Sequence, residues 1–109
     1  MAKPIPAAPN DLSLAAKAEW RRIHAGWEVD DSGRMLLTIA LRAADRAAAA
    51  RALVARDGMV VKAGKTTRAH PALAIVKDAE LVLLRAWRQL NLDVPPPGPM
   101  GRPPGRGPA

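Results

Sequence analysis

Several residue types are missing from this chain, and each absence removes a class of structure or function. The sequence has no cysteine, which excludes a disulfide framework and a thiolate metal site and fits a reducing compartment. It has no phenylalanine and no tyrosine, so Trp20, Trp27 and Trp87 supply all of its aromatic bulk. A core with so little aromatic surface is small. We therefore expect the chain to associate with copies of itself.

Long apolar runs are absent as well. No stretch reaches the roughly 18 apolar residues of a membrane-spanning helix, and the first ten residues carry no apolar signal core. We therefore expect no membrane partner and a cytoplasmic location.

Catalytic constellations are also missing. His24 and His70 lie far apart in the sequence, and neither an HExxH zinc motif nor a pair of carboxylates suited to acid–base chemistry occurs. His70 immediately precedes Pro71, which favours a role at the start of a helix over one as a ligand. We predict that the protein is not an enzyme and holds neither a cofactor nor a metal.

One string imitates a nucleotide-binding loop. Gly64, Lys65 and Thr66 match the end of the phosphate-cradling motif, but the earlier glycine of that motif is replaced by Met59. No strand–helix–strand pattern surrounds the string, so we expect no binding of ATP or GTP.

The sequence has a large excess of positive charge. The formal net charge is +7 and the isoelectric point is about 11.1. Such a charge favours a polyanionic partner, because each neutralised phosphate releases counterions. A basic protein without any nucleic-acid role is equally compatible with this composition.

Apolar residues at spacings of three and four predict three amphipathic helices, over Leu12–Trp27, about Gly33–Arg56 and about Pro71–Leu90. Gly58 and Asn91 suit helix C-termini with left-handed backbone. The predicted fold class is all-α, a long helical hairpin with the shorter first helix packed across it. The connector holds a short extended segment, Met59–Val61, before the turn at Gly64.

Composition divides the chain into three regions. Residues 1–10 contain three prolines and form an extended arm, residues 11–92 form the helical domain, and residues 93–109 form a disordered tail rich in proline and glycine. Arg102 and Arg106 in the tail resemble, faintly, arms that insert into the minor groove of DNA. A flexible solubilising tail is the alternative.

The second helix has an apolar arc too wide for one partner. One stripe consists of Leu36, Ile39, Ala43, Ala50 and Val54, and the adjacent stripe is alanine-rich, with Leu37, Leu41, Ala44, Ala48, Ala52 and Ala55. We predict that one stripe packs within the subunit and the alanine-rich one packs against a neighbouring copy. Alternatively, alanine serves helix propensity and faces water. In the third helix we expect a core face of Ala72, Ile75, Val76, Ala79, Leu83, Ala86, Trp87 and Leu90.

Six cations are candidate contacts to DNA phosphates. Three lie on the predicted first helix: Lys17, Arg21 and Arg22. The other three lie in the connector, which has no acid: Lys62, Lys65 and Arg68. His24 follows the same helical spacing as Lys17 and Arg21. A solvated helix face and an ordinary solvated loop are the alternatives.

Three phrases carry a family resemblance. They are Ala16–Ile23 with Trp20, the stretch ADRAAAARALVARDG ending at Gly58, and HPALAIVKDAELVLLRAWRQLNL from His70 to Leu92. In this order the chain resembles the small subunits of tailed-phage terminases of the short helical type, over roughly Leu12–Leu92. Asn91 stands where that family often has glycine.

The resemblance implies a ring-forming, non-enzymatic protein of viral genome packaging in an infected bacterial host. Such a protein recognises double-stranded viral DNA and delivers it to the large terminase subunit, which carries the ATPase and the nuclease. Two alternatives remain open. One is a small helical transcriptional regulator that binds DNA as a dimer, with the first helix or the connector in a groove. The other is an interaction module whose charge serves solubility alone.

Overall fold

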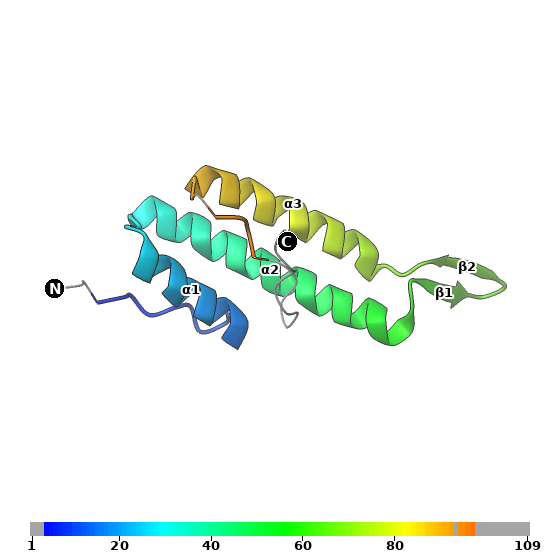
Figure 1. The fold of residues 1–109 in the computed structure, drawn as a ribbon. Coiled ribbons are helices and arrows are strands. Elements are labelled where there is room, and N and C mark those ends of the chain that lie inside the picture. The colour runs from blue at the N-terminus through cyan, green and yellow to red at the C-terminus, as the bar shows by residue number, and fades with distance from the viewer. Residues whose placement is uncertain (1–3, 93, 98–109) are drawn as a thin grey trace, which may run out of the picture.

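The computed structural model describes residues 4–92 and 94–97, which form three helices and one two-stranded sheet (Figure 1). The helices are α1 (Leu14–Gly26), α2 (Asp31–Asp57) and α3 (Ala72–Leu90). Strands β1 (Val60–Ala63) and β2 (Thr66–Ala69) come between α2 and α3 in the chain. The radius of gyration is 16.3 Å, whereas a compact chain of this length has about 13 Å. The molecule is therefore elongated, with extents of 64 × 36 × 23 Å.

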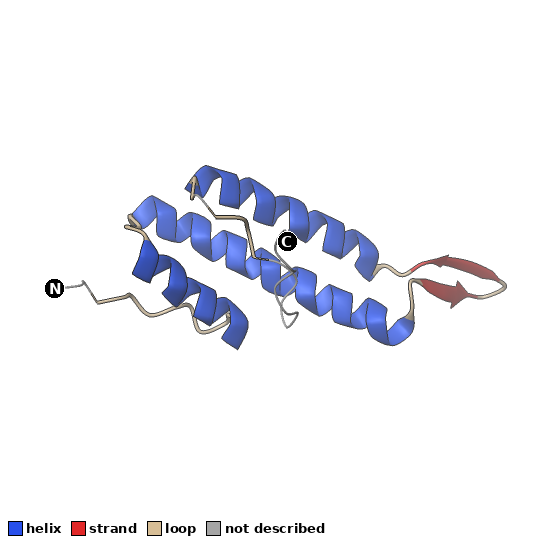
Figure 2. Ribbon diagram, in the orientation of Figure 1, coloured by secondary structure: helices blue, strands red, loops and turns tan. Residues whose placement is uncertain are grey.

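The predicted all-α fold is confirmed as mainly helical, but the connector corrects it. β1 and β2 pair antiparallel, with Val61 opposite Arg68 and Lys62 opposite Thr67, and they form a β-hairpin that projects beyond the helices (Figure 2). Valine and threonine favour extended backbone, and Gly64 takes the positive φ of 66° that the turn requires. The extended segment expected before Gly64 is thus one half of a paired ribbon.

Side chains and backbone conformation set the helix ends. The Ser13 hydroxyl accepts a hydrogen bond from the Ala16 amide at the start of α1, and Asp30 accepts one from Gly33 at the start of α2. Gly58 ends α2 with a φ of 87°, and Asn91 ends α3 in the left-handed conformation. The two predicted C-terminal residues are therefore confirmed.

The core lies where all three helices meet. In α1 the predicted stripe is buried at Ala16, Trp20 and Ile23, and Leu12 is buried just before the helix. From α2 and α3, the core takes Leu37, Ala40, Leu41, Ala43, Ala44, Leu83, Ala86 and Trp87. α1 packs mainly against α2, and its buried residues share one core with residues of both α2 and α3. Ser13 binds Asp45 through its amide (2.8 Å) and its hydroxyl (2.6 Å).

The predicted division of α2 into two stripes is wrong in its first half. Leu37, Leu41 and Ala44, assigned to a neighbouring copy, are buried within the chain, whereas Ile39 of the other stripe is 43% exposed. The reason is that α1 and α3 flank α2 from different sides, so its inward face is rotated from the expected one. Ile75 of α3, expected in the core, is 44% exposed.

Both tryptophans of the core hold a segment outside the helices. Trp20 Nε1 donates a hydrogen bond to the Pro6 carbonyl at 2.8 Å, which fastens the extended N-terminal arm. Trp87 Nε1 donates to the Val94 carbonyl at 2.9 Å, and Val94 packs against the core. Residues 93 and 98–109 of the predicted tail, which include Arg102 and Arg106, lie outside the described residues.

Candidate nucleic-acid interface

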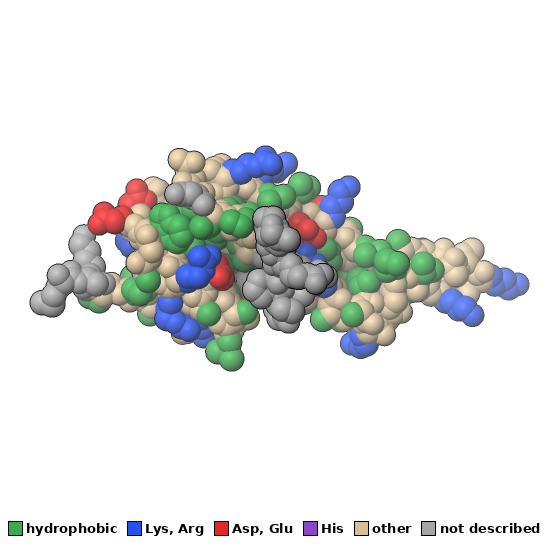
Figure 3. Space-filling view, viewed as in Figure 1, with side chains coloured by type: hydrophobic (Ala, Val, Ile, Leu, Met, Phe, Trp, Pro, Cys, Tyr) green, Lys and Arg blue, Asp and Glu red, His purple; other side chains and the backbone are tan. Residues whose placement is uncertain are grey.

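The structure separates the six predicted DNA contacts into two groups. Lys17, Arg21 and Arg22 lie on α1, beside the first half of α2. The other three lie on the β-hairpin after α2: Lys62 in β1, Lys65 in the turn and Arg68 in β2. Lys and Arg side chains are visible at this end of the molecule in Figure 3. A helix as long as α2, with 27 residues, spans about 40 Å. One subunit therefore carries no single patch made of all six.

The α1 group is partly neutralised. Arg22 forms two hydrogen bonds with the Glu19 carboxylate, at 3.0 and 2.8 Å, and they raise the pKa of Arg22 above its usual range. Lys17 is half-buried. His24 does not extend the basic edge as predicted, because its Nδ1 donates to the Trp20 carbonyl at 2.8 Å and its ring lies 4.5 Å from the Trp20 ring.

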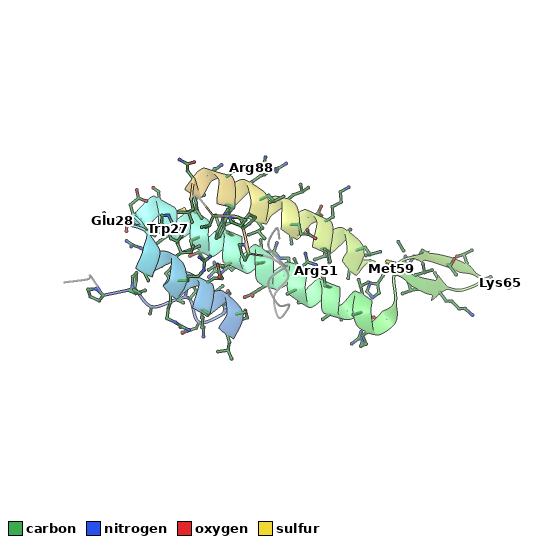
Figure 4. The ribbon with its side chains drawn as sticks, in the orientation of Figure 1. Trp27, Glu28, Arg51, Met59, Lys65 and Arg88 are labelled. Carbon is green, nitrogen blue, oxygen red and sulfur yellow. The ribbon has the colours of Figure 1, made fainter. Side chains whose placement is uncertain are left out.

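The hairpin group is exposed on every side. Residues that are paired across the strands share one face of the ribbon, so Lys62 lies on the face of Thr67 and Arg68 lies on the opposite face, with Val61. Lys65 is in the turn, at the extreme end of the molecule (Figure 4). The ribbon thus has one positive charge on each face and one at its tip.

The turn of the hairpin has a defined geometry. Gly64 is the first of its two central residues and has positive φ, while Lys65 does not, which is the pattern of a type II′ turn. Thr66 Oγ1 donates to the Ala63 carbonyl at 3.0 Å across the turn. The tip therefore presents Lys65 from a short, closed loop.

His70 anchors the base of the hairpin. Its amide donates to the Met59 carbonyl at 2.8 Å, continuing the pairing of β1 and β2. The Ala72 amide donates to His70 Nδ1 at 3.0 Å, so this nitrogen is unprotonated and Nε2–H donates to Asp57 at 2.9 Å. The predicted role of His70 at the start of a helix is confirmed.

Two acids near the base of the hairpin, Asp57 and Glu80, have cationic partners. Hydrogen bonds from Arg56 and then from His70 hold the pKa of Asp57 well below its usual range. Arg51 pairs with Glu80 at 2.8 Å between α2 and α3. The sequence has no acid from residue 58 to residue 77, and no described carboxylate forms an ion pair with the three hairpin cations. The hairpin is thus a cationic surface without internal compensation.

The opposite end of the molecule has an open groove of about 1150 Å³. It lies between the N-terminal arm and the ends of α1 and α3, and its apolar lining includes Ile5, Trp27, Val29 and Leu90. Within the described part of the chain, no group of histidines and carboxylates is arranged to hold a metal. None of the described helices is long and apolar enough to cross a membrane.

The sequence prediction included the hairpin cations but missed that Thr66 and Thr67 form part of a second strand, β2. The signal that predicts the second strand is the pair of β-branched residues on each side of Gly64, Val60 and Val61 before it and Thr66 and Thr67 after it. Comparison of the chain with models of known families, with curated proteins and with solved structures gives no match.

Proposed function

We propose that this protein is a non-enzymatic DNA-binding subunit of a viral packaging machine, of the terminase small-subunit type. It assembles into a ring, engages double-stranded viral DNA in the cytoplasm of the infected bacterium, and presents that DNA to the large terminase subunit. The resemblance over Leu12–Leu92 names the family. The observation that carries the DNA-binding part is the uncompensated basic hairpin, Lys62, Lys65 and Arg68.

Charge and position both support this role. Phosphate binding needs exposed cations whose charge is not already satisfied. All three hairpin cations meet that condition, whereas in the α1 group Arg21 meets it, Arg22 is paired with Glu19 and Lys17 is half-buried. Repetition around a ring multiplies these weak contacts, because each subunit that binds raises the effective concentration of the next. Association of subunits is therefore part of the DNA-binding mechanism.

The second half of the helical hairpin supplies surface for assembly. The predicted alanine-rich stripe stays accessible there, with Ala52 and Ala55 exposed and Ala48 half-buried. Leu53 and Leu81 are 39% and 43% exposed on the same two helices. Small side chains allow helix axes to approach closely, and a contact that repeats by rotation closes a ring.

Native mass and DNA binding test the proposal together. Sedimentation of the purified chain should give a discrete mass several times that of the 11.6 kDa monomer. Ala52→Glu should reduce assembly, whereas Ala18→Glu, on the exposed side of α1, should not. A monomer at high concentration would contradict the ring.

DNA binding is measured by fluorescence anisotropy at increasing salt, with a duplex from the packaged genome. The wild-type protein should bind with a steep loss of affinity as salt rises. A variant with all six predicted cations changed to glutamine should lose retention at low salt. Unchanged retention would contradict the site, and a co-purification of the protein with the large subunit would separate a packaging role from that of a free-standing regulator.

A further inference from the structure

The β1–β2 hairpin has the size and charge distribution of an element that enters a DNA groove. Each strand has four residues, and four extended residues span about 13 Å. The major groove of B-DNA is about 8.5 Å deep. The hairpin projects beyond the helices (Figures 1 and 2), so its tip can reach the groove floor while the helical body stays outside the duplex.

The thickness of the ribbon selects the groove. A sheet with its side chains is about 10 Å thick, while the major groove is about 12 Å wide and the minor groove about 6 Å. The two-stranded ribbon therefore fits the major groove and exceeds the width of the minor groove. The major groove of A-form RNA is too narrow for it.

The arrangement of the charges matches this orientation. Lys62 and Arg68 lie on opposite faces of the ribbon, and the phosphates of a groove lie on opposite walls. Lys65 occupies the leading end, beside Thr66 and Thr67, whose hydroxyls can bind base edges or phosphates. Cations on a single face would indicate a ribbon lying flat on the backbone instead.

We propose that the hairpin inserts tip-first into the major groove of duplex DNA. Lys62 and Arg68 then contact phosphates of the two strands, and Lys65 reaches the groove floor. The proposal rests on the proposed DNA-binding function and goes further, because it assigns contact to the hairpin rather than to α1 and to one groove rather than to the backbone alone.

The strands have little support from the helices, since Val61 is half-buried and the other residues of β1 and β2 are exposed. An isolated two-stranded hairpin is marginally stable in water. The anchor at His70 and the Gly64 turn therefore keep the ribbon formed before it meets DNA. A change that alters the shape of the turn without altering charge should consequently weaken binding.

The first experiment compares two triple variants of the full chain by anisotropy with the same duplex. Lys62→Gln/Lys65→Gln/Arg68→Gln should weaken binding at least ~10-fold and lower the salt slope by about 0.9 for each lost phosphate contact. Lys17→Gln/Arg21→Gln/Arg22→Gln removes the same charge and should change affinity by less than about 3-fold. Helical circular dichroism verifies that both variants keep the folded body.

The outcomes separate this proposal from the proposed function. If wild-type protein binds the duplex and the hairpin variant binds equally well, the hairpin assignment is wrong and DNA binding stands. If the wild-type protein does not bind the duplex at low salt, both fail.

The second experiment tests shape and groove. Gly64→Val keeps every charge. A β-branched residue does not readily adopt the φ of 66° that position 64 has in the turn, so this variant should bind DNA several-fold more weakly. A duplex carrying glucosylated hydroxymethylcytosine, which fills the major groove, should bind at least ~10-fold more weakly, and distamycin in the minor groove should not compete. Equal binding to the modified duplex, to double-stranded RNA of the same sequence, or by Gly64→Val would overturn groove insertion.

Discussion

The two ends of the α2–α3 hairpin are built differently. At the end beside α1, the core contains large side chains, among them Trp20, Ile23, Leu37, Leu83 and Trp87. At the end beside the β-hairpin, the buried residues are alanines only: Ala47, Ala50, Ala72 and Ala79. Buried apolar area provides most of the free energy of folding. Stability is therefore concentrated at the three-helix end, and the two-helix end depends on it.

The two-helix end also leaves apolar side chains partly exposed on both of its helices. Leu53 of α2 and Ile75 and Leu81 of α3 are examples, because no third helix covers them there. The basic ribbon extends from this less stable end, held by the His70–Asp57 contact and the Arg51–Glu80 ion pair. One end thus holds the fold together, while the other presents the surfaces that we assign to assembly and DNA.

The largest expected effect comes from removing a large buried side chain from the three-helix core. Trp87 is 4% exposed, and Trp87→Ala should lower the free energy of unfolding by about 3–5 kcal/mol through the lost burial and the cavity. Ile75→Ala at the other end should stay within about 0.5 kcal/mol. Urea unfolding followed by circular dichroism measures both. Similar losses of unfolding free energy in the two variants would contradict a stability concentrated at the three-helix end.

A smaller effect is expected from the junction of α1 and α2. Ser13 caps α1 through Ala16 and also donates to Asp45 at 2.6 Å, so Ser13→Ala should cost about 1–2 kcal/mol. Ser32, exposed in the first turn of α2, forms no side-chain hydrogen bond to another described residue, and Ser32→Ala is the matched control, with a change within about 0.5 kcal/mol. If Ser13→Ala unfolds like its control, α1 is not held at this junction.

The smallest effects should appear on acidification. Arg42 lowers the pKa of Asp11 at the three-helix end, and Arg56 with His70 lowers that of Asp57 at the hairpin base, both from an ordinary value of 3.8. Each carboxylate therefore stabilises the fold above its unfolded pKa, and its contribution is lost as the pH falls through its folded pKa.

The two ends should respond to this titration with different observables. Asp11→Asn should flatten the decline of the melting temperature on the acid side, since it acts where global stability resides. Asp57→Asn should instead speed hydrogen exchange of the hairpin amides, with little change in the melting temperature. A large shift of the melting temperature in Asp57→Asn would show that the hairpin base belongs to the cooperative core.

The sequence by itself determined the elements of local structure. Spacing at three and four residues predicted the three helices, and Gly58 and Asn91 predicted the C-terminal ends of two of them, because capping depends on side chains and backbone conformations within one turn. It also identified the hairpin cations as an acid-free group.

Only the tertiary structure decided which faces are inside and which cations lie together. Leu37 and Leu41 are buried because α1 and α3 flank α2 from different sides, and the spacing of residues along α2 contains no information about that placement. Likewise, Lys17 and Lys62 are both basic in the sequence, but Lys17 lies on α1, which packs beside α2, while Lys62 lies on the β-hairpin beyond the last residue of α2. Pairing across Gly64 places Lys62 and Arg68 on opposite faces of one ribbon, since strand register sets the face of each residue.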